Sequence, residues 1–351
     1  MSIKLNNKSI GNDSPVFIIA EIGVNHNGQS KLAQELILSA AKAGADAVKL
    51  QTFDTDSLIR RDAPKAKYQD ENIGPQKTQY QMLKELELDI AIYPELKELA
   101  EKNNIILFST PYDNKSVELL ESIGVLIYKL ASIDIVHHTL IEKIAQTKKP
   151  LILSTGMSTE DEIEQAAFVF NQAGGKKEDL ILLQCNTNYP ARIGDQNLRA
   201  SKVLHKYAEI IGFSDHTEGN QCSLAAVAMG AKVIERHLTL DKNLPGPDHK
   251  ASLNPIEFAN FVSQIRNLET ALGTDVKCPI GQELENISGM RRSICAAKEI
   301  LKGKEISFDD LNFKRPGTGL YPTKENINKI IGKRAGKNIS ADENIILSDL
   351  I

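Results

Sequence analysis

Lysines and hydroxyl side chains stand at the ends of several short segments whose other residues are nearly all apolar. These residues are Lys49, Ser109, Thr110, Lys129, Ser132, Ser154, Thr155, Thr187 and Ser214. Other polar residues at the same ends include Glu21, Gln51, Asn186, Asp215 and Glu235. A buried charge is costly unless it is paired, and a single lysine in such a segment more often reaches solvent at an edge. Two lysines and several hydroxyls at equivalent segment ends favour an anion-binding pocket, most simply one for phosphate.

Two histidines also follow neighbouring apolar segments. Neutral imidazoles are common ligands of divalent transition metals, so His216 and His237 could share an ion, with an adjacent carboxylate completing or orienting the site. The alternative is that each histidine lies at the surface or caps an element, and the two interpretations carry similar weight. His26, within residues 25–28, is interpreted as a turn residue.

Two further features permit a chemical and a structural interpretation. Asp248 and His249 lie in a loop, residues 243–250, that two prolines and a glycine make rigid. They could recognise a polar ligand, but the sequence slightly favours solvated turn residues. Cys185 has no flanking motif of a nucleophile, so a buried thiol is the preferred interpretation.

The scaffold must bring these segment ends together. Eight apolar, β-rich segments alternate with amphipathic stretches, at 16–24, 47–53, 105–110, 126–131, 150–156, 180–187, 209–215 and 233–240. Eight strand–helix units within about 250 residues predict an α/β TIM (β/α)8 barrel, whose active site lies at the carboxyl ends of its strands. A doubly wound sheet is the main alternative, but its glycine-rich phosphate loop is missing after the first segment.

Segment spacing also predicts the domain organisation. The longest interruption, residues 54–89, follows the second segment and would lie on the active face of a barrel. After Gly273 the periodicity ends, and short strands then alternate with turns in a basic stretch. The prediction is a barrel over 1–273, a linker over 274–290 and a small module over 291–351.

Composition excludes several classes of protein. The 42 Lys and Arg against 46 Asp and Glu give a formal net charge of −4, which argues against nucleic acid as a partner. No apolar segment approaches the roughly 20 residues of a membrane span, and the polar start lacks the apolar centre of a signal peptide. The four cysteines show no metal-type spacing and no disulfide framework. We therefore expect a soluble, cytoplasmic protein without a membrane partner.

Seven motifs together resemble the N-acylneuraminate (sialic acid) synthase family. They are IIAEIGVNHNG (18–28), AGADAVKLQTF (43–53), STPYD (109–113), ILSTGMST (152–159), IGFSDHT (211–217), ERHLTLDKNLPGPDHKASL (235–253) and KRPGTG (314–319). The resemblance implies a TIM barrel followed by a small, β-rich, antifreeze-like (SAF) domain. It also implies condensation of phosphoenolpyruvate with an open-chain N-acylated amino hexose, either N-acetylmannosamine or a 2,4-diacetamido-trideoxy hexose. The products would be a nine-carbon α-keto acid and phosphate, and the cofactor a divalent metal, manganese or else magnesium or cobalt.

The resemblance further implies roles for individual residues. Glu21 would be the catalytic carboxylate, with Lys49, Lys129 and Asp134 in the catalytic set. Phosphoenolpyruvate would be held by Lys49, Thr110, Lys129, Ser132, Ser154 and Ser214, the sugar by Gln51, Tyr189, Asp248 and Arg315, and the metal by His216 and His237. In the family the equivalent of Arg315 enters the barrel of a second subunit, which implies a domain-swapped homodimer.

Two segments depart from the family pattern. KLASID (129–134) ends in Asp134 where many relatives have Glu, and CNTNYPA (185–191) lies where relatives vary. Both lie where the sugar is expected, so they affect the choice of sugar rather than the reaction. Two alternatives remain: a non-catalytic protein that binds glycan or protein through its C-terminal module, and a barrel synthase that uses an unacylated aldose.

Overall fold

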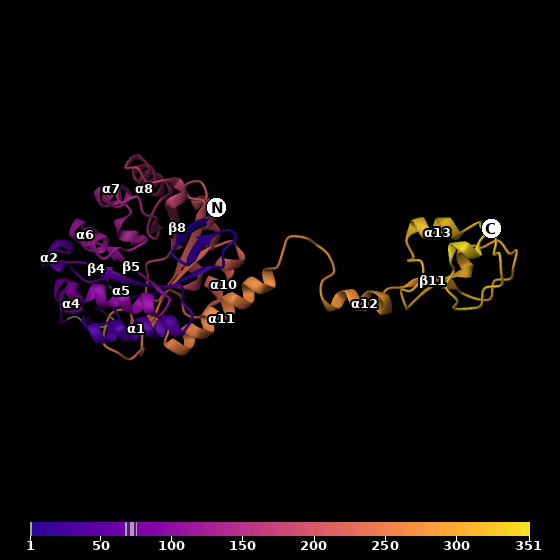
Figure 1. Ribbon diagram of the computed structural model, residues 1–351, viewed down its shortest axis with the longest axis horizontal. Coiled ribbons are helices and arrows are strands. Elements are labelled where there is room, and N and C mark those ends of the chain that lie inside the picture. The colour runs from indigo at the N-terminus through magenta and orange to yellow at the C-terminus, as the bar shows by residue number, and fades with distance from the viewer. Residues whose placement is uncertain (1, 67–68, 71–73, 75) are drawn as a thin grey trace. The chain divides into compact units, whose positions relative to one another are not determined.

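The computed structural model describes residues 2–66, 69–70, 74 and 76–351 (Figure 1). The chain separates into two compact units, one ending at Gly273 and the other running from Thr274 to Ile351. Within the described residues, no helix combines the length and the apolar character that a membrane span requires.

The N-terminal unit is built around an eight-stranded parallel sheet that curves into a barrel (Figure 1). The strands follow one another around the sheet in chain order, and β10 pairs with β3, while β5 and β6 lie side by side. The strands are β3 (Phe17–Gly23), β4 (Ala47–Thr52), β5 (Ile106–Pro111), β6 (Tyr128–Leu130), β7 (Leu151–Ser154), β8 (Leu180–Cys185), β9 (Ile210–Asp215) and β10 (Val233–His237). The predicted TIM barrel is confirmed.

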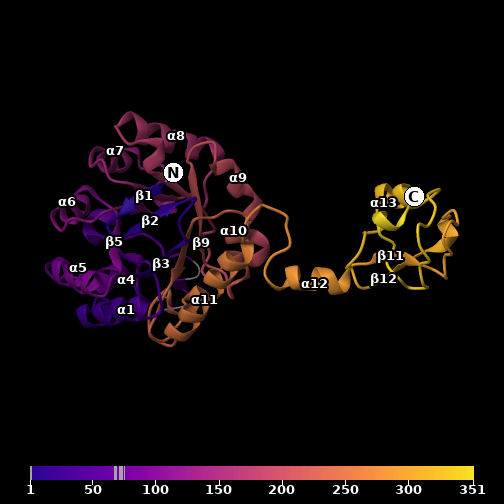
Figure 2. The same cartoon turned by 45° about the vertical axis from the view of Figure 1, so that its right-hand side comes forward.

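Helices form an outer ring around these strands (Figure 2). They bury one apolar stripe against the sheet, which explains why the strands are apolar on both faces. Side-chain caps begin several of them, as Thr159 and Asn254 do with complete capping boxes. The ring consists of α1 (Ser30–Lys42), α5 (Tyr93–Lys102), α6 (Asn114–Ser122), α7 (His138–Gln146), α8 (Glu160–Gln172), α9 (Ser201–Leu204), α10 (Gln221–Ala228) and α11 (Pro255–Leu272).

A hairpin that the sequence analysis did not predict precedes the barrel. Strands β1 (Ser2–Leu5) and β2 (Lys8–Gly11) pair antiparallel through a turn in which Asn6 has a φ of +54°. Ile3, Leu5 and Ile10 are buried against the side chains that fill the barrel from its N-terminal end. The alternation of buried and exposed residues in β1 is the sequence signal for this hairpin.

The described part of the long interruption after β4 includes two short helices. They are α2 (Thr55–Leu58) and α4 (Gln79–Leu86). Thr78 caps α4 with its side chain, while the Gln81 side chain bonds back to the Thr78 backbone. Since the carboxyl end of β4 opens on the active face, this insertion covers one side of that face.

The C-terminal unit is small and has its own apolar core. It contains α12 (Gln282–Met290), β11 (Ser293–Ala296), β12 (Leu311–Lys314) and α13 (Lys324–Ile330), joined by turns. Residues 274–290 were predicted to be a linker, but α12 occupies their second half, where a helical pattern follows Gly281. Residues 274–281 are exposed and contain no regular element.

Candidate active site

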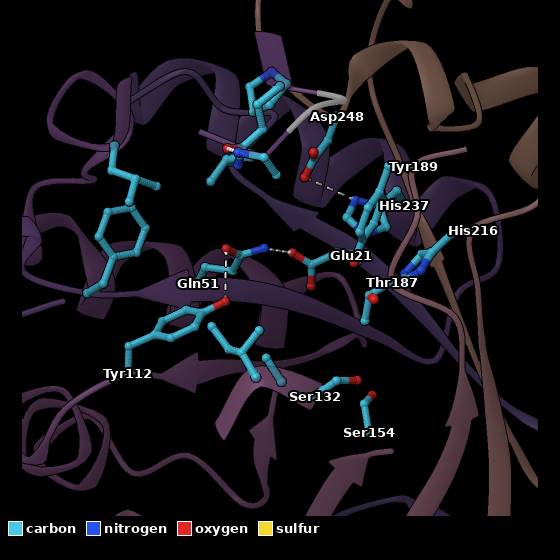
Figure 3. Close-up of a pocket in the computed structure, with 18 of the residues that line it drawn as sticks. Glu21, Gln51, Tyr112, Ser132, Ser154, Thr187, Tyr189, His216, His237 and Asp248 are labelled. Carbon is cyan, nitrogen blue, oxygen red and sulfur yellow. Dashed lines mark hydrogen bonds and ion pairs between the residues drawn. The ribbon is translucent and has the colours of Figure 1, made fainter. Parts of the chain in front are cut away.

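A cavity of about 420 Å³ opens where the barrel strands end (Figure 3). Most of the residues that the sequence analysis selected line it. These are Glu21, Lys49, Gln51, Lys129, Ser132, Ser154, Tyr189, Ser214, His216, His237 and Asp248. Parallel strands end at one edge of the barrel, so side chains far apart in the chain converge there.

Four buried charges form the floor of the cavity. Lys49 Nζ lies 2.5 Å from Glu21 Oε2 and 3.9 Å from Glu235 Oε2. Lys129 Nζ lies 3.9 Å from Glu235 Oε1 and donates to Ser154 Oγ at 2.6 Å. Two lysines therefore face two carboxylates in a site shielded from water, where electrostatic interactions are strong.

Glu235 is the functional candidate whose role the sequence analysis missed. It was noted at a strand end but given no role, although it stands two residues before His237 and so shares its face of β10. Ser214 Oγ donates to Glu235 Oε1 at 2.9 Å, whereas Oε2 has no hydrogen-bond partner within the described residues. This carboxylate holds the two lysines in place and partly neutralises them.

Burial and the neighbouring charges separate the pKa values of the two carboxyl groups. Burial, reinforced by Glu235, raises the pKa of Glu21 against the pull of Lys49. Burial also opposes ionisation of Glu235, but Lys129 and Lys49 outweigh it and lower its pKa to about 2. Glu235 is therefore a fixed negative charge, while Glu21 is suited to exchange a proton.

The pKa values of the two lysines also shift in opposite directions. Burial would lower the pKa of Lys49, but Glu21 and Glu235 overcome this effect and raise it. For Lys129 burial prevails, and its pKa falls despite the attraction of Glu235. A bound anion would supply a negative charge that favours protonated Lys129, so the floor of the cavity is suited to bind an anion.

His216 and His237 face each other across the ends of β9 and β10, with ring centroids 5.3 Å apart. Burial, with mutual repulsion for His216 and the field of Lys49 for His237, lowers the pKa of each to about 3, so both imidazoles are neutral. His216 Nδ1–H donates to the Asn186 carbonyl at 2.5 Å, since a carbonyl can only accept. The lone pair of His216 is therefore on Nε2.

This histidine pair fits a divalent transition metal. Metal-binding histidines characteristically donate their second nitrogen to a carbonyl or carboxylate, as His216 does to Asn186. Asp248 Oδ2 lies 3.7 Å from His237 Nδ1. Within the described residues no group of three or more His, Cys, Asp or Glu side chains could hold a metal ion. An ion held by the two imidazoles would therefore keep positions open for water or substrate.

A buried ion pair on the outer side of β9 and β10 fixes the histidines. Arg236 Nη1 donates to Asp215 Oδ2 at 2.8 Å, and the same guanidinium donates to the carbonyls of Thr217 and Gly219. Ser223 Oγ donates to Asp215 as well. Because Asp215 precedes His216 and Arg236 precedes His237, this Asp215–Arg236 clamp sets the spacing of the two imidazoles.

Polar side chains on the β3–β4 side connect to Glu21. Gln51 Nε2 donates to Glu21 Oε1 at 3.0 Å, and Tyr112 OH donates to Gln51 Oε1 at 3.3 Å (Figure 3). A Cβ at Gly23 would overlap the Glu21 carboxylate and the Gln51 amide, so this pair requires glycine there. The Glu21–Gly23 segment also carries a register shift against β4.

Tyr189 and Asp248 complete the rim above the histidines. The Tyr189 ring lies 4.0 Å from the ring of His216 and 5.5 Å from that of His237, measured between centroids. Burial and the Glu21 charge raise the pKa of Asp248 to about 7. Asp248 thus points into the cavity and is not a solvated turn residue, whereas His249 bonds to Thr239 and packs within the loop.

Three selected residues are not among those that line the cavity. Thr110 is buried and accepts a hydrogen bond from Lys49 Nζ at 3.1 Å, so it orients that lysine. Asp134 is buried beside His137, its Oδ2 has no hydrogen-bond partner in the described structure, and burial raises its pKa to about 7. Arg315 belongs to the C-terminal unit, where it is exposed and donates to Met290 Sδ at 3.9 Å.

The interpretations of Cys185 as a buried thiol and of His26 as a turn residue agree with the structure. Cys185 is buried, and burial raises the pKa of its thiol to about 11, so it is an inert side chain and not a thiolate nucleophile. His26 lies in a turn in which its Nδ1 accepts from the Gly28 N–H at 3.1 Å.

A barrel with buried lysines, a carboxylate suited to proton transfer and two neutral imidazoles defines an enzyme of the TIM-barrel class that binds an anion. Comparison with known families specifies it further. The model of the NeuB family matches residues 36–277, and that of the SAF domain matches residues 291–351. The chain belongs to the NeuB family.

Relatives cover nearly the whole chain. The N,N'-diacetyllegionaminic acid synthase of Campylobacter jejuni is 44% identical, over 93% of this chain and 97% of the relative. The synthase of the same name from Legionella pneumophila is 43% identical, over 97% and 96%. A crystal structure of the N-acetylneuraminic acid synthetase of Leptospira borgpetersenii in complex with citrate matches with a TM-score of 0.71 and 38% identity, over 82% and 95%. The prediction of an enzyme is confirmed, and no finding favours a non-catalytic binding protein.

Proposed function

We propose that the protein condenses phosphoenolpyruvate with an open-chain N-acylated amino hexose, giving a nine-carbon α-keto acid and phosphate. The observation that carries this proposal is the shared cavity, in which Lys49 and Lys129 lie beside Glu21 and the pair His216 and His237. The relatives are nonulosonic acid synthases, and this chain is a transferase of the same kind. Such a reaction needs one place for an anion and one for an aldehyde, and the cavity offers both.

Phosphoenolpyruvate would occupy the lysine floor. Lys49 and Lys129 contribute charge-assisted hydrogen bonds to its phosphate and carboxylate, and the hydroxyls of Ser132, Ser154 and Ser214 add neutral donors. Thr110 would keep Lys49 aimed at the ligand. Because these groups are fixed before the ligand arrives, they need little reorganisation during the reaction.

The sugar would lie above this floor, with its aldehyde at the histidines. Gln51, Tyr189 and Asp248 are placed to bond its hydroxyl and acylamino groups. His216 and His237 would hold a divalent metal, manganese or else magnesium or cobalt, which when bound polarises the aldehyde as a Lewis acid. We also propose a homodimer in which Arg315 of a second subunit contacts the sugar.

In the bond-forming step, C3 of phosphoenolpyruvate attacks the aldehyde carbon, and its double-bond electrons form the new carbon–carbon bond. The π electrons of the aldehyde move to its oxygen, which becomes an alkoxide. Water adds to C2, where positive charge develops, and Glu21 accepts one proton of this water and returns it to the alkoxide, which becomes a hydroxyl. The resulting tetrahedral centre collapses to a ketone as its C–O bond to phosphate breaks, and the second proton of the water leaves with the phosphate. Lys49 and Lys129 stabilise the departing phosphate, and Glu235 keeps both lysines positioned throughout.

The direct test is phosphate release from phosphoenolpyruvate with Mn²⁺ and an N-acylated amino hexose. We expect release that requires both substrates, stops with excess chelator and resumes when Mn²⁺ is restored. Lys129→Met is the matched negative control, because it removes the charge and roughly preserves the side-chain volume. Sugar-dependent release that persists in excess chelator would refute the metal assignment, and no release with any N-acylated hexose would refute the proposed function.

We also propose that the protein acts in the cytoplasm. All four cysteines are free, and Cys278 is exposed. Free thiols suit the reducing cytoplasm, where phosphoenolpyruvate is present as a metabolite.

A further inference from the structure

The loop after β10 leaves the barrel and returns to it at neighbouring positions. Leu238 and Leu253 form a parallel bridge, and the Leu253 N–H donates to the His237 carbonyl at 2.9 Å. Asp248 lies near the end of this loop, and its side chain points into the cavity toward His237 (Figure 3). The carboxylate lies 3.7 Å from His237 Nδ1, beyond hydrogen-bond distance, so the backbone of the loop sets where it points.

Five polar side chains fix this backbone, and they are called here the loop anchor. Two come from the turn after β3 and three from the loop and its base: Asn25, Asn27, Thr239, His249 and Ser252. All of them except Asn27 are at most 2% exposed. Buried polar groups find their hydrogen-bond partners within the protein, so the loop anchor holds the loop in one arrangement.

One half of the loop anchor holds the backbone of Asp248 directly. Asn25 Nδ2 donates to the Leu238 carbonyl at 2.9 Å and to Ser252 Oγ at 2.8 Å. Ser252 Oγ in turn donates to the Asp248 carbonyl at 2.7 Å. These bonds connect the turn after β3 with both the start of the loop and Asp248.

His249 forms the other half of the loop anchor. Its Nδ1 lies 2.7 Å from Thr239 Oγ1, and its Nε2 lies 3.1 Å from Asn27 Oδ1. Burial lowers the pKa of His249, so its imidazole is neutral. Because Asn27 Oδ1 can only accept, Nε2 carries the proton, and Nδ1 accepts from the Thr239 hydroxyl. The ring therefore bridges the turn after β3 and the base of the loop.

The loop is packed closely around this imidazole. A Cβ at Gly246 would lie 2.7 Å from His249 Cδ2 and 2.9 Å from its Nε2, so only glycine permits this approach. Gly246 lies two residues before Asp248, and His249 is the next residue after it. A shift of the ring therefore displaces the backbone on both sides of Asp248.

We propose that His249 is a positioning residue, which directs the Asp248 carboxylate toward the sugar through its bonds to Asn27 and Thr239. This inference rests on the proposed function, since it takes Asp248 as a contact of the sugar. Such a contact is made equally before and during the chemical step, so displacing it raises the KM for the sugar and leaves kcat nearly unchanged. Loss of a hydrogen bond to a charged group weakens binding by about 10–100-fold.

The test is steady-state phosphate release by His249→Leu, which removes both bonds of the ring and leaves an apolar side chain. The sugar is N-acetylmannosamine or a 2,4-diacetamido-2,4,6-trideoxy hexose, whichever the parent uses faster. At saturating phosphoenolpyruvate and Mn²⁺ we expect the KM for the sugar to rise by about 10–100-fold, with kcat and the KM for phosphoenolpyruvate nearly those of the parent.

Two further variants separate positioning from a general loss of structure. His249→Gln keeps an N–H donor for Asn27 and should recover most of the affinity for the sugar. His205→Leu is the matched control, because it makes the same substitution at an exposed histidine at the end of α9, outside the residues that line the cavity. Its kinetic constants should be those of the parent.

The outcomes separate this inference from the proposed function. An unchanged KM for the sugar in folded His249→Leu, an equal rise in the KM for phosphoenolpyruvate, or a His249→Gln variant as impaired as His249→Leu would overturn the positioning role and leave the synthase activity standing. No release by the parent with any N-acylated hexose would overturn both proposals. If His249→Leu does not fold, Asn27→Gly removes the acceptor of Nε2 and permits the φ of +50° at this residue. The same rise in the KM for the sugar is expected of it, and a parental value would overturn the inference.

Discussion

The Asp215–Arg236 clamp gives the most demanding prediction about the metal. Asp215→Asn removes the charge opposite Arg236, whose side chain is 2% exposed, and breaks an ion pair of 2.8 Å. Leaving one partner of a buried pair uncompensated costs about 3–5 kcal/mol of folding free energy. Each kcal/mol lowers the Tm of a domain of this size by about 2–4 °C.

The effect on metal binding is separate from this loss of stability. Positioning groups outside the ligands of a metal typically change its affinity by about 10–100-fold when mutated. We therefore expect the Kd for Mn²⁺ of folded Asp215→Asn to rise by about 10–100-fold, as measured from the electron paramagnetic resonance signal of free Mn²⁺ at a temperature well below its Tm. Phosphoenolpyruvate affinity without metal should change little, because the lysines lie on other strands.

Asp46→Asn is the control for this experiment. Asp46 Oδ2 also pairs with an arginine, Arg266, at 2.8 Å, but it precedes β4 at the opposite end of the barrel. This variant should lose some stability and keep the parental affinity for Mn²⁺. Parental Mn²⁺ affinity in folded Asp215→Asn would refute the reasoning that the clamp positions the histidines.

Three further predictions concern the lysines of the cavity floor, Gly23 in β3 and the buried Asp134. Lys49→Met and Lys129→Met each remove a charge-assisted contact of about 1.5–3 kcal/mol, so the Kd for phosphoenolpyruvate measured by calorimetry should rise at least about tenfold. Gly23→Ala should displace Glu21 and lower kcat by about 100-fold, which steady-state kinetics would show, because misplacement by ~1 Å has that effect. For Asp134, whose pKa is raised to about 7, the folded state favours the protonated form. Its contribution to stability is complete below about pH 4 and is lost as the pH rises through 7, so Asp134→Asn should be more stable than the parent at pH 8 by up to about 4 kcal/mol in urea denaturation.

Each of these has an outcome that would contradict it. Unchanged phosphoenolpyruvate affinity in both methionine variants would place the anion pocket elsewhere. For Gly23→Ala the control is Gly194→Ala, since a Cβ there has no atom within 4 Å, and equal kcat in the two alanine variants would contradict the steric argument. If Asp134→Asn leaves the dependence of stability on pH intact but abolishes turnover, Asp134 acts in the chemistry and not in folding.

The barrel could be predicted because strands buried on both faces are apolar at nearly every position in the sequence. The ends of β4, β6 and β9 carry Lys49, Lys129 and Ser214, which contrast sharply with their apolar neighbours, so the anion site was visible as well. Glu235 was not assigned a role, since its part in the site depends on distances to two lysines from other strands. The β1–β2 hairpin was missed because only three apolar side chains mark it.

The apolar side of the cavity, which includes Met82 and Leu86 of α4, was not predicted for a different reason. Met82 and Leu86 are ordinary core-facing residues of an amphipathic helix in sequence, and only the fold shows that the face they form also borders a cavity. The same holds for the clamp: Asp215 and Arg236 point away from the cavity, so their pairing follows from the register of β9 and β10. Such second-layer contacts require the three-dimensional structure.

The β1–β2 hairpin has a consequence for the order of events in turnover. Since Ile3, Leu5 and Ile10 fill the N-terminal end of the barrel, reactants and products share the entrance at the strand ends. Lys129, at 2% exposure, lies at the bottom of this blind passage, while Met157 at its rim is 66% exposed. A sugar that arrived first would stand between phosphoenolpyruvate and the floor, so the depth of the passage favours binding of the anion before the sugar.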